Sequence, residues 1–274
     1  MKKIIALTLA LFAFAGMAFA QVDLGKVKDG VYFAQDDKYS SSGWKEQVIV
    51  EVKGGKIVEA TWNGVSNLAG AKDKASYAAA GKYGMVKASK IKAEWDAQAK
   101  AAAAYLVKTQ DVNFSKFDKD GKTDAISGAT LTVSGFFGLA KKALASAPVA
   151  QGAYKDGWYF AEQKDFDKNS GWKDTVLVTV VNGSVVDVLW NGVYKDNSKK
   201  SKLVEAVQGR YGMAKAAKKG EWNVQAAAVE AAIVKAGDPS KIAMKADGTS
   251  DAVSGASIHL TVVALAIEAL KAAK

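Results

Sequence analysis

Apolar and polar residues alternate along several short segments of the chain, which is the pattern of half-buried β-strands. In residues 47–53 every second residue is a Val, so Val48, Val50 and Val52 share one face. Gly54-Gly55 then turns the chain into a second segment, residues 56–62, and a shorter one, residues 31–35, precedes the pair. These segments predict a small antiparallel sheet.

The same arrangement returns later in the chain. Residues 175–181 and 184–190 flank Asn182-Gly183, a two-residue combination typical of a tight β-hairpin. Ala-rich residues 94–108 and 221–235 lack helix-breaking residues and predict helices, the second ended by Gly237 and Pro239. Further helices are expected over residues 72–82, 132–145, 202–210 and 260–272. Strands followed by helices predict an α+β fold, with helices packed on a small, mostly antiparallel sheet.

The chain is an internal duplication with an offset of 127 or 128 residues. Asp29-Gly-Val-Tyr-Phe-Ala matches Asp156-Gly-Trp-Tyr-Phe-Ala, and Trp62-Asn-Gly-Val matches Trp190-Asn-Gly-Val. A period of this length predicts two tandem domains of one fold, residues 21–149 and 150–274. Residues 146–152, which include Pro148, form the expected linker.

The N-terminus has the three parts of a secretory signal peptide. Lys2 and Lys3 precede an apolar run, and Ala18-Phe-Ala20 places small residues before Gln21. We therefore expect residues 1–20 to be removed and the protein to be exported to the periplasm, the cell envelope or the exterior. The chain contains no Cys, which excludes a lipoprotein anchored through Cys, disulfides, thiolate catalysis and Fe–S ligation.

The net charge is +10, or +8 without Lys2 and Lys3. Basic nucleic-acid-binding proteins usually gather Arg and Lys on one element, whereas this chain has one Arg, Arg210, and dispersed Lys. We expect no nucleic-acid partner. The charge suits a solvated surface that meets acidic membranes peripherally or an acidic redox partner.

One short motif occurs once in each half. Asp124-Ala-Ile-Ser-Gly-Ala-Thr130 returns 127 residues later as Asp251-Ala-Val-Ser-Gly-Ala-Ser257. Each copy precedes an apolar, helix-like run, where unpaired backbone N–H groups and the helix dipole favour a phosphate. The alternative is that the hydroxyl residue is a helix N-cap and the Gly serves the turn.

This motif resembles the flavinylation motif of FMN-binding domains, such as those in the C subunit of the sodium-pumping NADH:quinone reductase and the G subunit of the Rnf complex. The resemblance covers nearly all of residues 21–274 and implies two FMN groups. Each would be joined by a flavin transferase through a phosphoester bond, to Thr130 and to Ser257. The other motif residues would complete the cofactor sites: Ser127, Gly128, Ala129 and Asp124 in the first, and Ser254, Gly255, Ala256 and Asp251 in the second.

The second copy departs from the first. Ser257 replaces Thr, and the segment that follows it looks one residue longer than Leu131-Thr132. The resemblance implies that the transferase reads Asp124 and Asp251; the alternative is an ordinary Asp turn. Their charge would repel an FMN phosphate without a cation, so we do not place them on the phosphate itself.

Seven Trp residues offer flat apolar surface for a flavin ring, although core packing is their commoner role. The best ring contacts combine an aromatic residue with Gly: Trp-Asn-Gly at 62–64 and 190–192, and Tyr-Gly-Met at 83–85 and 211–213. Residues 165–171 resemble a calcium loop but have Val176 where a bidentate Glu is needed, so we interpret them as a turn. His259 is the only His, which excludes two-His metal sites and a Ser-His triad within one chain.

These features predict an exported electron carrier with two covalent FMN groups, serving a membrane-bound or soluble redox partner, rather than a stand-alone enzyme. Two alternatives remain open: an FMN-carrying component that feeds an extracytoplasmic reductase, and a non-redox envelope protein that binds a small ligand in its Trp-Asn-Gly clefts.

Overall fold

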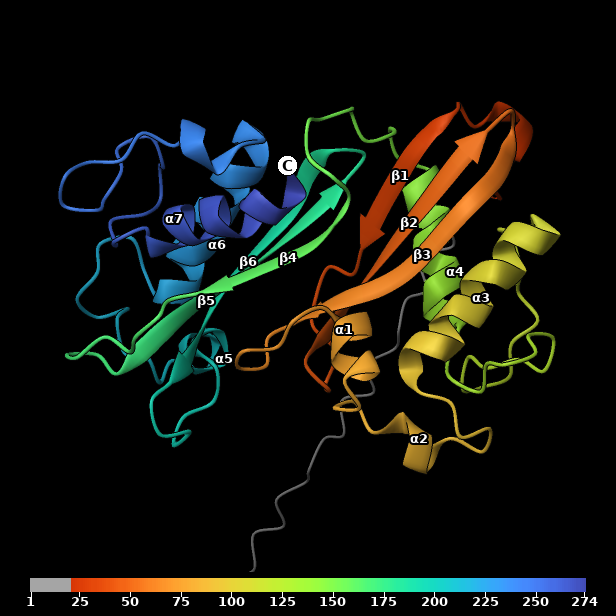
Figure 1. Cartoon of the computed structure of the whole chain (residues 1–274), viewed down its shortest axis with the longest axis horizontal. Helices are drawn as coiled ribbons and strands as arrows, with labels where there is room; N and C mark the ends of the chain where they lie inside the picture. The colour runs from red at the N-terminus through yellow and green to blue at the C-terminus, as the bar shows by residue number, and fades with distance from the viewer. Residues whose placement is uncertain (1–20) are drawn as a thin grey trace, which may run out of the picture.

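The computed structural model describes residues 21–274, so the predicted signal peptide lies outside the described residues. Two antiparallel three-stranded sheets, each packed with helices, form two similar halves (Figure 1). The expected α+β fold is therefore confirmed. Within residues 21–274, no helix has the length and apolarity needed to cross a membrane.

The first half contains a sheet in the order β1-β2-β3. Its strands are β1 (Gly30–Gln35), β2 (Trp44–Lys53) and β3 (Lys56–Ser66). A short 3-10 helix, η1 (Leu24–Lys26), precedes them, and the helices α1 (Lys74–Ala79), α2 (Met85–Ala88), α3 (Trp95–Thr109) and α4 (Ser134–Leu144) follow. α3 packs on β3, and α4 packs on β1 and β2.

The second half repeats this plan in the order β4-β5-β6. Its strands are β4 (Gly157–Glu162), β5 (Trp172–Val181) and β6 (Ser184–Tyr194). The helices are α5 (Lys202–Val207), α6 (Trp222–Ala236) and α7 (Thr261–Ala269), with the 3-10 turns η2 (Pro239–Lys241) and η3 (Leu270–Ala273). Val48 pairs with Trp62 in one sheet and Val176 with Trp190 in the other, so the two sheets share one register.

Each half has its own core. Val48, Val50 and Val52 are at most 1% exposed and face α3 and α4, as the alternation predicts. Val176, Val178 and Val180 form the corresponding row against α6 and α7. The stabilisation of each half therefore comes mainly from burial of one sheet face under its helices.

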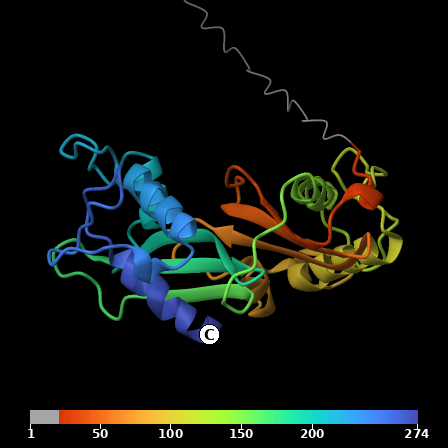
Figure 2. The ribbon, with the colours of Figure 1, turned by 90° about the horizontal axis from the view of Figure 1, so that it is seen from above.

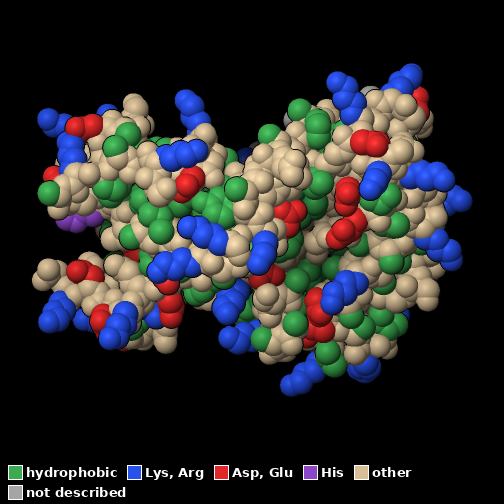
Figure 3. Space-filling model, turned by 45° about the horizontal axis from the view of Figure 1, so that its top comes forward, with side chains coloured by type: hydrophobic (Ala, Val, Ile, Leu, Met, Phe, Trp, Pro, Cys, Tyr) green, Lys and Arg blue, Asp and Glu red, His purple; other side chains and the backbone are tan. Residues whose placement is uncertain are grey.

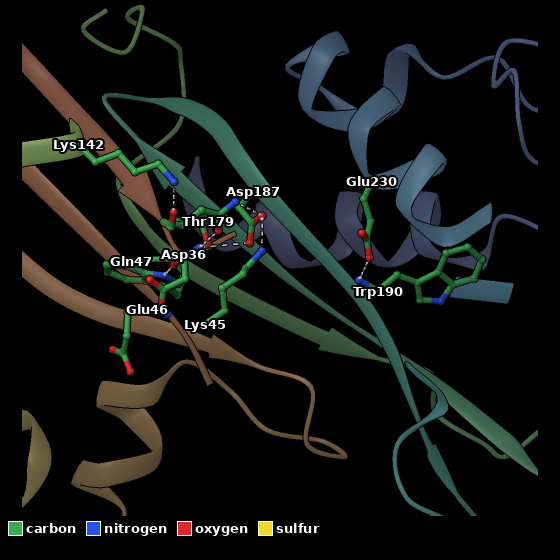
Figure 4. A network of polar contacts seen from close by, with 11 residues as sticks. Asp36, Lys45, Glu46, Gln47, Lys142, Thr179, Asp187, Trp190 and Glu230 are labelled. Atoms are coloured by element: carbon green, nitrogen blue, oxygen red, sulfur yellow. Dashed lines mark hydrogen bonds and ion pairs between the residues drawn. The ribbon is translucent and has the colours of Figure 1, made fainter. Parts of the chain in front are cut away.

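The other faces of the two sheets meet at the centre of the molecule (Figures 1 and 2). A small apolar cluster of Val65, Leu177 and Leu189 joins the halves. Beside it lies Gln47, which is fully buried; it donates to Asp187 at 3.2 Å and accepts from the Trp158 indole at 2.7 Å (Figure 4). Because these polar groups find their partners across the interface, the halves are held in one orientation.

The linker is fixed to both sheets. The Val149 amide donates to the Val31 carbonyl, and the Asn182 side chain donates to the Val149 carbonyl at 2.7 Å. Residues 146–152 thus run between the halves in an ordered path. The division into domains 21–149 and 150–274 stays a prediction.

The predicted helix ends differ from the observed ones. The helix expected over residues 132–145 begins at Ser134, and the one expected over 260–272 ends as α7 at Ala269 and continues as η3. The amides of Val133 and Ser134 both donate to the Gly121 carbonyl, which holds the preceding residues outside the helix. The strand expected over residues 56–62 extends to Ser66.

Candidate functional site

The first motif copy is a surface turn between α3 and α4. Ile126 and Ala129 are buried in the core, whereas Asp124, Ser127 and Thr130 are exposed. Apolar anchors alternate with polar residues, so the turn presents its polar side chains to solvent while its backbone stays packed on α3.

The Gly of each motif has a packing reason. Gly128 has φ +88°, and a Cβ there would come within 3.3 Å of the Ala101 side chain on α3. Gly255 has φ +112°, with the Ala228 side chain of α6 at 3.2 Å. A left-handed backbone and close approach to a helix both favour glycine.

A buried glutamine orients the last residue of each motif. Gln98 of α3 is fully buried, and its Oε1 accepts from the Thr130 amide at 2.7 Å and from the Thr130 hydroxyl at 3.1 Å. Gln225 of α6 does the same for Ser257, at 2.8 Å and 3.3 Å. Because the hydroxyl hydrogen points to the glutamine, the oxygen lone pairs point away from the core.

Sequence reasoning missed this pair. Gln98 and Gln225 lie 127 residues apart, each three residues after the Trp of a Glu-Trp pair that both halves contain, at 94–95 and 221–222. Their Nε2 groups donate to the carbonyls of Ala93 and Gly220, which fixes the side chains. The duplication itself was the signal that could have found them.

The prediction that each motif hydroxyl lies at the start of a helix is wrong. Thr130 lies four residues before α4, and Ser257 four residues before α7. The N-cap positions are Val133 and Leu260, and neither forms a side-chain cap. The motif hydroxyls are therefore neither N-caps nor seated in the first helical turn. The predicted extra residue after Ser257 is also wrong, because both helices begin at the same distance from their motifs.

A cavity of about 620 Å³ lies beside Thr130. Its wall includes the aromatic side chains of Trp62, Tyr83 and Trp95, together with Lys74. The Trp62 and Trp95 ring centroids are 5.3 Å apart at 71°, and Tyr83 lies 6.3 Å from Trp95. An exposed hydroxyl thus stands at the edge of a cavity with flat apolar walls.

A buried ion pair forms the polar part of this cavity. Lys74 is 4% exposed, pairs with Glu46, and its Nζ lies 4.4 Å from the Trp95 ring centroid. Glu46 also accepts from the Trp62 indole at 2.9 Å. Burial lowers the pKa of Lys74 and raises that of Glu46, and in each case the partner's opposite charge counters part of the shift.

The corresponding ion pair of the second half differs in its partners. Lys202 pairs with Asp174 at 2.8 Å, and the Thr261 hydroxyl donates to the same carboxylate. Asp174 is one carbon shorter than Glu46, and the buried Trp190 indole has no hydrogen-bond partner within residues 21–274. The two sites therefore present different electrostatic surroundings.

Some residues of the Tyr-Gly-Met and Trp-Asn-Gly segments line the cavity, and others bond to the backbone around it. Tyr83, Met85 and Trp62 line the cavity. Asn63 instead holds the backbone: its Oδ1 accepts from the Gly64 and Ala75 amides. Glu94 accepts from the Met85 amide at 2.9 Å, which ties the Tyr-Gly-Met loop to α3. Met213 and Glu221 repeat this contact.

The remaining candidates lie on the surface. Asp124 and Asp251 are exposed, and Asp251 pairs with Lys245 at 2.5 Å. His259 is exposed in the loop before α7. Residues 165–171 form the expected turn, in which Asp167 accepts from the Ser170 amide at 2.7 Å. Within residues 21–274, no group of three or more His, Cys, Asp or Glu side chains is placed to hold a metal ion.

The family match among the comparisons with known proteins falls in the first half. The family described as "FMN-binding domain" matches residues 43–145. A protein from Clostridium thermocellum, solved by NMR in solution, is 47% identical over 44% of this chain and 95% of its own, with a TM-score of 0.35. A crystal structure from Clostridium perfringens is 25% identical over 43% of this chain and 87% of its own, with a TM-score of 0.32. No curated protein matches.

Proposed function

This chain belongs to the FMN-binding domain family, and from that premise we propose that it is an exported electron carrier with two covalently attached FMN groups. FMN supplies the redox chemistry, and the protein supplies attachment, orientation and shielding from water. The family model matches residues 43–145. The second half has the same strand register and a copy of the motif, so we extend the proposal to it.

The residues beside Thr130 fit the group. A cavity of about 620 Å³ falls within the range of about 300–1,000 Å³ typical of small-molecule sites. Trp62, Tyr83 and Trp95 offer surfaces on which a flavin ring can rest. The Lys74–Glu46 ion pair supplies both a hydrogen-bond donor and an acceptor at this wall.

The observation that carries the proposal is the placement of the Thr130 hydroxyl. It is exposed, lies at the edge of the aromatic cavity and is oriented by Gln98. Attachment requires that this oxygen lose its proton and bond to the phosphorus of the FMN half of a flavin dinucleotide. The phosphoanhydride bond breaks, and the other nucleoside monophosphate is the leaving group. Within residues 21–274, no His lines the cavity beside Thr130, and we assign removal of the proton to a separate flavin transferase.

Ser257 is the second proposed attachment residue. Its amide and hydroxyl both donate to Gln225, as those of Thr130 do to Gln98. The Lys202–Asp174 pair takes the place of Lys74–Glu46. Because their surroundings differ, we expect the two flavins to have different reduction potentials, which suits transfer of electrons from one to the other.

Export and the redox partners belong to the proposal as well. Lys side chains are scattered over both halves rather than gathered on one element (Figure 3). Such a surface suits transient contact with an acidic redox partner or an acidic membrane. The donor is then a membrane-bound or soluble reductase, and a covalent anchor prevents loss of the cofactor outside the cytoplasm.

Acid precipitation of the purified protein tests the proposal. Protein produced with a matching transferase should give a yellow pellet, because a phosphoester bond survives denaturation and non-covalent binding does not. A colourless pellet with yellow supernatant would contradict covalent attachment alone. Protein that never acquires flavin would favour the non-redox ligand-binding alternative.

A further inference from the structure

A second cavity, of about 660 Å³, lies in the first half along the edge of β3. Its walls come from β3, from α3 and from Trp158 of the second half. The Trp158 ring is held by its indole N–H, which donates to Gln47 at 2.7 Å. Ala103, Ala104 and Val107 of α3 form the apolar side. The two cavities share Trp62, but Thr130 lines only the first.

The strand β3 is the open edge of its sheet, because it pairs only with β2. Side chains cover the two ends of this edge. Gln110 bonds to both the amide and the carbonyl of Ile57 at 2.8 Å, and Asn63 accepts from the Gly64 amide at 2.9 Å. Ala60 and Trp62 lie between these ends and line the cavity.

The second half shows what occupies the same position on its own edge strand. The Trp190 amide donates to Glu230 Oε1 at 2.7 Å (Figure 4). Trp62 has the same pairing as Trp190, so its amide also points away from the sheet. The residue of α3 that corresponds to Glu230 is Ala103, 127 positions earlier. Within residues 21–274, no side chain accepts from the Trp62 amide.

The first half therefore has the donor and the space for a carboxyl group, but not the carboxyl. The charges at its rim do not require an anion: Lys100 is paired with Asp96 at 3.9 Å, and the other charged lining residues are Glu59, Asp73 and Lys108. Burial raises the pKa of Glu230 to about 8. Burial thus favours the uncharged form of this carboxyl, and a carboxamide presents the same acceptor oxygen.

We propose that this second cavity is a binding site for a small molecule that carries a carboxyl or carboxamide oxygen on a flat apolar body. The oxygen accepts from the Trp62 amide, in the position that Glu230 Oε1 takes beside Trp190. The apolar body lies between Trp158 and Val107. The site shares Trp62 with the proposed flavin cavity but contains neither attachment residue, Thr130 or Ser257.

Titration of the ¹⁵N-labelled chain, residues 21–274, with benzamide and with benzoate tests this site. The Trp62 amide resonance should shift saturably with at least one probe, and the probe that binds tighter identifies the charge state. Ala103→Glu places the missing carboxyl on α3 and should weaken binding at least tenfold. Ala97→Glu is the matched control, because Ala97 is exposed on the same helix away from the cavity; it should leave the affinity unchanged.

Ala103→Leu fills the cavity without adding an acceptor and should also weaken binding at least tenfold, which keeps the test decisive if the Glu variant fails to fold. The site is refuted if neither probe shifts the Trp62 amide. It is also refuted if the folded Ala103 variants bind as tightly as the unsubstituted chain.

Discussion

Thr130 and Ser257 differ from the neighbouring hydroxyl residues in what their oxygens contact. The Thr132 hydroxyl donates to the Asp120 carbonyl at 2.9 Å, and the Thr261 hydroxyl donates to the buried Asp174. Each of these two hydroxyls is therefore already bonded to a backbone carbonyl or a buried carboxylate. The hydroxyls of Thr130 and Ser257 instead rest on a glutamine and remain exposed, which suits them to react.

The glutamines give the first prediction. Gln98→Leu should lower FMN attachment at Thr130 but leave attachment at Ser257 unchanged, because the hydroxyl loses its orienting acceptor in one site only. The unpaired Thr130 amide should also cost about 1–3 kcal/mol of stability. Peptide mapping by mass spectrometry measures each site separately.

Gln225→Leu is the matched control, with the opposite pattern expected. Equal loss of flavin at both sites in either variant would show a global folding defect. No loss at the affected site would contradict a role for the glutamine.

At the scale of the elements, the motif turn depends on its glycine. Gly128→Ala should destabilise the first half by about 1–2 kcal/mol, because φ is +88° and a Cβ would meet the Ala101 side chain at 3.3 Å. Urea unfolding followed by Trp fluorescence measures the change.

Gly138→Ala within α4 is the control for this turn. A Cβ there meets nothing within 4 Å, and the substitution should stabilise the helix by about 0.5–1 kcal/mol. Equal effects at Gly128 and Gly138 would contradict the packing explanation.

The sequence predicted those elements whose signal is local. The strands follow from a period of two residues, and α3 and α6 follow from Ala-rich runs without breakers. The start of α4 could not be predicted from local sequence, because it is set by hydrogen bonds to the Gly121 carbonyl in a distant turn. Gln98 has no local signature within an Ala-rich helix, and the four-residue α2 is too short for a periodic pattern. Thr130 could be predicted from its motif, but its cavity required the tertiary structure.

At the scale of the whole molecule, the centre is sensitive to pH. Burial raises the pKa of Glu230 from its usual 4.5 to about 8, and Asp187 adds to the rise (Figure 4). The folded protein therefore binds a proton that the unfolded chain has released. The free energy of unfolding should fall as the pH rises from about 4.5 to about 8.

Glu230→Gln should reduce the change of the free energy of unfolding with pH. The Gln side chain does not titrate, but its oxygen still accepts from the Trp190 backbone N–H. Thermal unfolding at several pH values measures the effect. An unchanged slope in the variant would show that other groups produce it.

The two halves should fold independently. Each has its own sheet, helices and buried core, so residues 21–149 and 150–274 expressed apart should each melt cooperatively. Separation exposes Leu177 and Leu189 of the second half, which should lower its solubility more than that of the first. A broad, non-cooperative melt of either half would contradict the tandem-domain prediction.

The intact mass of the chain produced with a matching transferase tests the central claim most directly. The account predicts two FMN increments on the unsubstituted protein, one on Thr130→Ala, one on Ser257→Ala and none on the double variant. The Thr132→Ala control should keep both. Retention of both increments by Thr130→Ala, loss of one by Thr132→Ala, or no increment on any form would contradict it.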